Sequence, residues 1–93
     1  MGAVAEAIRA KLMGALAPSR LDVVDQSHLH AGHAGARQGG ESHFHVTVVA
    51  EAFAGEGAVA RQRRVYKILA DELAGPVHAL GLSLRAPGEE GVS

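Results

Sequence analysis

The segment from Ser42 to Ala50 constrains the fold most, because apolar and polar residues alternate along it. One face of the extended strand carries Phe44, Val46, Val48 and Ala50, and the other carries His43, His45 and Thr47. A strand of this kind packs one face on a core and leaves the other to water or a partner. The rest of the chain must therefore supply apolar elements that cover one face of a sheet.

Two stretches have the spacing of amphipathic helices. In the first, Val4, Ile8, Leu12 and Leu16 recur every fourth residue, and Pro18 ends the helix. The second begins at about Val59 and ends before Gly75 and Pro76, a typical helix stop. Its inward residues are predicted to be Val65, Ile68, Leu69 and Leu73, and its water-facing ones Arg61, Arg64, Lys67 and Asp71.

Two further strands are predicted, at residues 21–25 and 77–86, so the order is α-β-β-α-β. The first two strands can pair antiparallel, and a right-handed β-α-β crossover places the last strand parallel to the second. We predict an α+β fold: a two-layer sandwich with a three-stranded mixed sheet and both helices on one face. The 93 residues form one domain, with a folded core over about 3–86 and a frayed tail over 87–93.

The composition excludes several classes of function. The chain has no cysteine, so it offers neither disulfides nor thiolate ligands. A net charge of −1 argues against a generic binder of polyanions. Glu6, Arg9 and Lys11 interrupt the apolar N-terminal stretch, which is amphipathic rather than typical of a signal peptide or a membrane span. We expect a soluble, cytoplasmic protein with no membrane partner.

Histidine is concentrated in one part of the chain. Five of the six histidines fall between His28 and His45, and His28, His30 and His33 form H-x-H-x-x-H in the glycine-rich window 27–41. Imidazole is the commonest protein ligand for transition metals and titrates near neutral pH, which favours a site here. A solvated polar loop and a histidine-only zinc site are the alternatives. His43 and His45, on the outward strand face, are expected to meet solvent or a partner.

Six motifs in register resemble the BolA family, over residues from about Ile8 to Pro87. They are Asp25-Gln-Ser-His28, Gly39-Gly-Glu-Ser-His-Phe44, Phe53-x-Gly55, Val59-x-Arg-x-Arg-x-Val-Tyr66, Leu69-x-x-Glu-Leu73 and Val77-His-Ala-Leu80. The resemblance implies a fold similar to type II KH domains. It also implies partnership with monothiol glutaredoxins that carry a Cys-Gly-Phe-Ser motif.

In such pairs a [2Fe–2S] cluster bridges the two proteins, and the glutaredoxin side supplies a cysteine and a glutathione thiol. The resemblance assigns the other ligands here to His78 and to a histidine of the 27–41 window, His30 or alternatively His33. No cofactor is expected in the isolated chain, which would be a monomer or a weak homodimer. Without the resemblance, the sequence favours His78 as a residue at the edge of the core beside Leu80.

The basic residues Arg61, Arg63, Arg64 and Lys67 of the second predicted helix support an alternative function. They fit a solvated helix face, a docking site for glutaredoxin, or DNA contacts of a transcriptional regulator. Many relatives have Arg-His-Arg where this chain has Arg61-Gln62-Arg63, and no G-x-x-G loop of a KH domain is present. No combination of nucleophile, base and acid is evident, so an enzyme is not expected.

Overall fold

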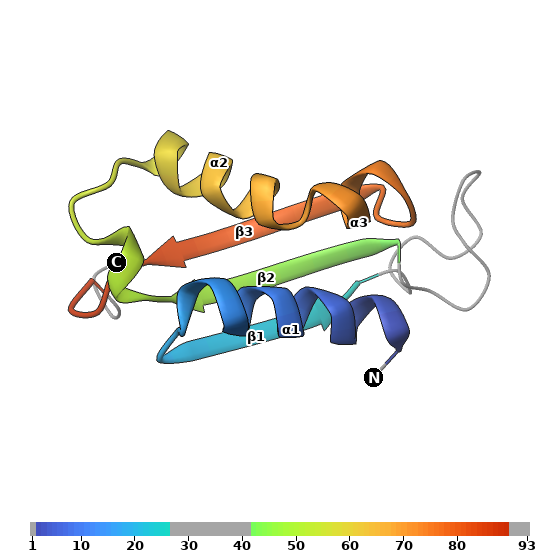
Figure 1. The fold of residues 1–93 in the computed structure, drawn as a ribbon, viewed down its shortest axis with the longest axis horizontal. Coiled ribbons are helices and arrows are strands. Elements are labelled where there is room, and N and C mark those ends of the chain that lie inside the picture. Colours follow the sequence, from blue (N-terminus) through green and yellow to red (C-terminus); the bar gives the residue numbers. More distant parts are fainter. Residues whose placement is uncertain (1, 27–41, 90–93) are drawn as a thin grey trace.

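The computed structural model describes residues 2–26 and 42–89 (Figure 1). In chain order its elements are α1 (Ala3–Leu16), β1 (Arg20–Asp25), β2 (His43–Val49), the 3-10 helix η2 (Glu51–Phe53), α2 (Ala58–Ile68), α3 (Ala70–Ala74) and β3 (Ala79–Arg85). No helix in these two stretches is both long enough and apolar enough to cross a bilayer. The window that holds His28, His30 and His33 lies outside the described residues.

The three strands form one mixed sheet in the order β1-β2-β3. β1 runs antiparallel to β2, and β3 runs parallel to it, so that Val24, His45 and Gly81 lie side by side across the sheet. The predicted α+β class, strand order and pairing directions are confirmed. Because β2 and β3 are parallel, both begin at one end of the sheet and finish at the other (Figure 1).

The core lies between the sheet and the helices. Phe44, Val46 and Val48 of the central strand are almost completely buried, as the alternation predicts. α1 lies across β1 and β2, whereas α2 runs along β3 (Figure 1). The helices contribute Ile8, Leu12, Val65 and Leu69 to the same cluster, and Leu80, Leu82 and Leu84 of β3 pack against it. Full burial of such a side chain contributes about 1.5–3 kcal/mol.

The second predicted helix is in fact two helices. Leu69 leaves helical geometry, with φ −100° and ψ 21°, and separates α2 from α3. The short α3 carries Glu72, whose Oε1 accepts a hydrogen bond of 2.9 Å from Lys11 Nζ on α1. This bond raises the pKa of Lys11. After the break, the short α3 contacts α1 through the pair of Lys11 and Glu72. The periodicity of the sequence does not reveal this contact.

Candidate functional site

His78 lies in the short connection between α3 and β3, where its neighbours fix the backbone. Val77 is buried, and its N–H donates to the carbonyl of Glu72 at 3.0 Å. The His78 N–H donates to the carbonyl of Ser42 at 2.7 Å. The His78 side chain is exposed, so the residue is not part of the core. Hydrogen bonds therefore fix the backbone at His78, while the imidazole ring is exposed to solvent.

A second imidazole lies against His78. The rings of His43 and His78 are stacked, with centroids 6.3 Å apart and an angle of 22° between their planes. Nδ1 of His43 is 2.8 Å from the hydroxyl of Ser42, which is completely buried. The sequence predicts His43 only as an outward strand residue, although the predicted parallel pairing of the second and last strands already brings the starts of those strands to one end of the sheet.

The histidine-rich window begins and ends at this same place. The last described residue before it, Gln26, donates its N–H to the carbonyl of His43 at 2.7 Å. The first described residue after it, Ser42, accepts the His78 N–H. Both attachment points of the window therefore lie beside the starts of β2 and β3. His30, the fourth residue after Gln26 in the sequence, lies outside the described residues.

His45, the other outward histidine of β2, has a separate environment. Its Nε2 lies 3.0 Å from the Ser83 hydroxyl on β3. A Cβ added at Gly81 would lie 2.8 Å from His45 Nδ1, so only glycine leaves room for this ring. A glycine inside a strand is the sequence signal for such a close approach.

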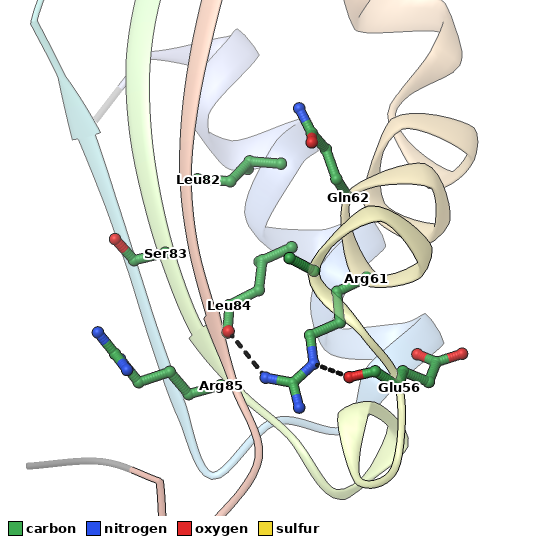
Figure 2. Close-up of a pocket in the computed structure, with 8 residues that line it drawn as sticks. Glu56, Arg61, Gln62, Leu82, Ser83, Leu84 and Arg85 are labelled. Carbon is green, nitrogen blue, oxygen red and sulfur yellow. Dashed lines mark hydrogen bonds between the residues drawn. The ribbon is translucent and has the colours of Figure 1, made fainter. Parts of the chain in front are cut away.

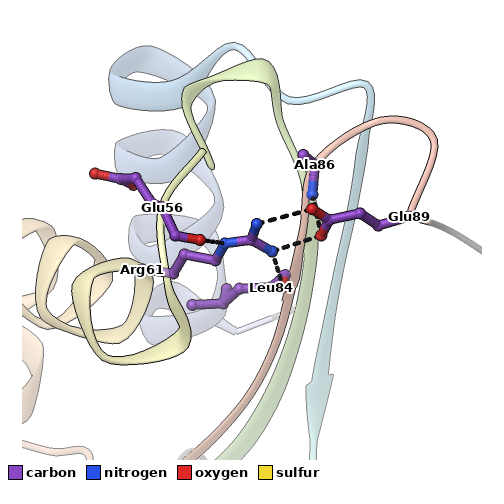
Figure 3. A network of polar contacts seen from close by, with 5 residues as sticks. All are labelled: Glu56, Arg61, Leu84, Ala86 and Glu89. Carbon is purple, nitrogen blue, oxygen red and sulfur yellow. Dashed lines mark hydrogen bonds and ion pairs between the residues drawn. The ribbon is translucent and has the colours of Figure 1, made fainter. Parts of the chain in front are cut away.

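The structure corrects the prediction that Arg61 faces water, because only 12% of its side chain is exposed. Its guanidinium donates to the carbonyls of Glu56 and Leu84 at 2.9 and 3.1 Å (Figure 2). Its two terminal nitrogens, Nη1 and Nη2, also donate to the two carboxylate oxygens of Glu89, at 2.6 and 2.9 Å (Figure 3). This pairing, with the Ala86 N–H, lowers the pKa of Glu89 to about 2. Arg61 thus holds together α2, β3 and the turn that follows β3.

Glu89 belongs to the stretch that the sequence assigns to a frayed tail. In the structure its N–H donates to the carbonyl of Ala86 at 3.0 Å, and its carboxylate accepts from the Ala86 N–H at 3.0 Å. Glu89 therefore makes defined contacts with Ala86 and Arg61. A pairing of this kind, between residues 28 positions apart, is invisible to periodicity.

The other three basic residues are more accessible. Arg64 pairs with Glu56, with its Nη2 2.5 Å from Oε2. Arg63 and Lys67 make no ion pair with any other residue that the structure describes. All three line a groove of about 390 Å³ between the end of α1 and α2, whose floor includes Leu16 and Ile68. The basic surface therefore consists of Arg63, Arg64 and Lys67 without Arg61.

The described part of the chain does not by itself form a metal site. Within 2–26 and 42–89 no group of three or more His, Cys, Asp or Glu side chains is arranged to hold a metal ion. What the structure does bring together is the exposed His78, the neighbouring His43 and the two attachment points of the histidine-rich window.

Several relatives are similar over most of this chain. A Sinorhizobium sequence described as an uncharacterized protein in the cobS 5′ region is 46% identical, over 90% of this chain and 91% of its own length. SufE-like protein 1 of Arabidopsis thaliana is 43% identical over 88% of this chain, which spans only 23% of that protein. The DNA-binding transcriptional regulator BolA of Vibrio cholerae is 44% identical, over 85% of this chain and 71% of its own length.

A solved structure and a family model agree with these relatives. The BolA domain of SufE1 from Arabidopsis thaliana superposes with a TM-score of 0.86 at 40% identity, covering 96% of this chain and 98% of that domain. The model of the family described as BolA-like protein matches residues 12–89. Neither match is to a catalytic family. The chain belongs to the BolA family.

Proposed function

We propose that this BolA family chain is a non-enzymatic partner of a monothiol glutaredoxin. In the complex, His78 and His30, or alternatively His33, would complete the ligands of a bridging [2Fe–2S] cluster used in iron–sulfur cluster trafficking or iron sensing. The glutaredoxin cysteine and a glutathione thiol would supply the other two. The observation that carries the proposal is the position of His78, exposed and beside both attachment points of the histidine-rich window.

The residues present fit such a group. An exposed imidazole offers a ring nitrogen to a metal. The hydrogen bond from the His78 N–H to the Ser42 carbonyl fixes the position of the His78 backbone, which carries that ring. The stacked His43 restricts the space on one side of the His78 ring. Because the chain contains no cysteine, any ligand that it contributes is a nitrogen or an oxygen.

Nitrogen ligation determines how such a site would behave. Histidine ligands raise the reduction potential of a [2Fe–2S] centre relative to all-thiolate ligation. A protonated imidazole cannot bind a metal, so cluster retention should fall as the pH drops through the imidazole range. With two neutral ligands from this chain, the site should release its cluster more readily than one of four thiolates, which suits a carrier or a sensor.

Anaerobic co-purification with a co-expressed monothiol glutaredoxin tests the proposal. The complex should contain about two irons and two sulfides per pair of chains, with visible circular dichroism distinct from that of the glutaredoxin alone. His78→Ala should remove most of this iron and change the spectrum. His30→Ala and His33→Ala should separate the two candidates, because only the ligand should behave like His78.

Two other histidines serve as matched controls. His45→Ala removes an imidazole from the outer sheet face, where it contacts Gly81 and Ser83, and should leave the iron content unchanged. His43→Ala removes the stacked neighbour without removing a proposed ligand, and it should retain iron. A spectrum and iron content that survive His78→Ala would show that the proposal is wrong.

DNA binding is the second candidate, and the groove between α1 and α2 favours it. Arg63 and Lys67 there have no acidic partner among the described residues, and the Vibrio cholerae relative carries the name of a DNA-binding regulator. Arg61 is not available for this role, because Glu89 and two carbonyls occupy its donors.

A salt series of gel shifts tests this second function. If Arg63 and Lys67 contact phosphates, affinity for a duplex should fall steeply with salt, and Arg63→Gln with Lys67→Gln should reduce the slope by about two. Arg20→Gln is the control, because Arg20 lies on β1, is not among the residues that line the groove, and pairs with Asp22. Absence of any shift at low salt would exclude DNA as a ligand of this surface.

A further inference from the structure

Among the described residues, Ser42 is the only polar residue with no exposed surface, and it contacts two histidines. Its carbonyl accepts two N–H groups at the start of β3, that of His78 at 2.7 Å and that of Ala79 at 3.2 Å. Its hydroxyl is 2.8 Å from Nδ1 of His43, the next residue. Ser42 therefore holds the backbone that carries the His78 ring and also the ring of His43.

The His43 ring is held at both ends. Its backbone belongs to β2 and lies opposite Ala79 of β3 in the parallel register. Its Nδ1 is held by the buried Ser42 hydroxyl, which restricts rotation of the ring about the bond to Cβ. A hydroxyl can donate to this nitrogen or accept from it, so the contact survives a change of tautomer.

The His78 ring has a different kind of support. Within residues 2–26 and 42–89, no hydrogen bond to this ring is found, and its ring contact is the stack on His43, with centroids 6.3 Å apart. Offset aromatic rings attract each other at centroid separations of about 4.5–7 Å. An exposed side chain without such a neighbour exchanges freely among its rotamers. The stack is therefore the contact that can favour one orientation of His78.

We propose that Ser42 and His43 are positioning residues for the His78 ring: the buried hydroxyl orients His43, and the face of His43 selects one rotamer of His78. Neither residue is a proposed ligand. A ligand that is already oriented loses less conformational freedom when it binds. The benefit for metal binding rests on the proposed cluster ligation, whereas the orientation itself is a property of the isolated chain.

A second hydroxyl–imidazole contact on β2 and β3 provides a matched control. His45 Nε2 lies 3.0 Å from the Ser83 hydroxyl, a contact of the same chemistry. The His45 ring lies beside Gly81, and it stacks on no other ring in the part of the chain that the structure describes. Removal of the Ser83 hydroxyl therefore reproduces the loss of a serine–histidine contact without affecting the His43–His78 stack.

Nuclear magnetic resonance of the isolated, metal-free chain tests the orientation. Three-bond couplings to Cγ of His78 measure its χ1 populations, and one rotamer should exceed the others by about two- to tenfold. His43→Ala should bring the populations close to equal, whereas His43→Phe, which keeps a flat ring, should retain the preference. Ser42→Ala keeps the carbonyl but loses the hydroxyl and should weaken the preference, and Ser83→Ala should leave it unchanged.

The glutaredoxin complex provides a second measurement, the rate at which iron passes to an excess of chelator. His43→Ala should retain iron on purification but release it about two- to tenfold faster than wild type, because the His78 ring is less often in the binding orientation. His43→Phe should release iron at close to the wild-type rate. A phenylalanine variant that behaves like the alanine variant in both measurements would overturn the role of the stack.

The measurement on the wild-type chain does not depend on any variant folding. Equal rotamer populations of His78 in that chain overturn this inference and leave the proposed ligation by His78 standing. A preferred rotamer that is lost in His43→Ala supports the inference. If that result is found and His78→Ala still retains iron in the complex, the orientation holds and only the proposed function fails.

Discussion

The two ends of the sheet handle their polar groups in opposite ways. At the end where β2 and β3 finish, here called the Phe53 end, Phe53 is completely buried and the Arg61 guanidinium lies 5.9 Å from its ring centre. Glu89 and two carbonyls take the hydrogen bonds of that guanidinium. At the end where the strands begin, the His78 end, an exposed imidazole lies beside a second one.

This difference separates residues that hold the fold from residues that are available for binding. Arg61 looks like a binding residue in the sequence, yet internal partners satisfy it and it has little left to offer a ligand. His78 looks like a core residue, yet its backbone is fixed and its ring is not enclosed. A stable end and an accessible end thus exist on one small sheet, as expected when a rigid framework positions a binding group.

The largest effect should come from the Phe53 end. Phe53→Ala removes a fully buried ring beneath Arg61 and should lower the free energy of unfolding by about 3–5 kcal/mol. That is a large fraction of the stability of a domain this size. Urea denaturation followed by far-UV circular dichroism measures it. Phe53→Leu, which keeps most of the volume, should lose much less, and equal losses would contradict the packing described here.

A smaller effect is expected midway along the sheet, where Gly81 adjoins His45. Gly81→Ala forces the His45 ring away from its 2.8 Å approach and from the Ser83 hydroxyl. Loss of that hydrogen bond with local crowding should cost about 1 kcal/mol. A double-mutant cycle with His45→Ala, measured by urea denaturation, should recover most of the loss. Additive effects would mean that the two residues do not contact each other.

The pH dependence of stability sharpens the comparison further. The pKa of Glu89 is lowered from 4.5 to about 2, first by the Arg61 hydrogen bonds and then by the Ala86 N–H. Its contribution is therefore complete above the unfolded pKa and disappears as the pH falls from about 4.5 toward 2. Wild type should lose stability across that window relative to Glu89→Gln, measured by thermal unfolding at each pH. Parallel curves for the two proteins would show that the ion pair contributes nothing.

The sequence predicts the fold class and most of the elements, because a period of two or four residues reflects which face is buried. The alternation at Phe44, Val46 and Val48 is the clearest example, since all three are buried as expected. Local patterns do not reveal contacts between distant residues. The pairing of Arg61 with Glu89 and the stacking of His43 on His78 depend on how strands and turns meet in space, and neither was predicted.

The histidine cluster by itself favours a site in the 27–41 window, but the pairing of that window with His78 is predicted only through the family resemblance. His78 has the parity of Leu80 and Leu82, so periodicity places it with the core, yet β3 begins after it, at Ala79. A residue just outside a strand does not have to follow the alternation of that strand. The assignment of His30 or His33 stays a prediction, because both lie outside the described residues.

The smallest effect on stability should come from the His78 ring. Because the side chain is exposed and the bond to the Ser42 carbonyl comes from the backbone, His78→Ala should change the free energy of unfolding by no more than about 0.5 kcal/mol. His78→Pro is the matched contrast, since it removes the donor of that 2.7 Å bond and should cost clearly more. Urea denaturation of the isolated chain measures both.

The pair of variants separates the ring from the backbone at the His78 end. If alanine costs as much as proline, the ring stabilises the fold through its stacking on His43, and the contrast between the two ends of the sheet fails. If alanine is nearly neutral in the isolated chain and still abolishes iron in the glutaredoxin complex, the ring contributes to binding and not to folding. We expect this outcome, because the exposed His78 ring is not needed to stabilise the fold.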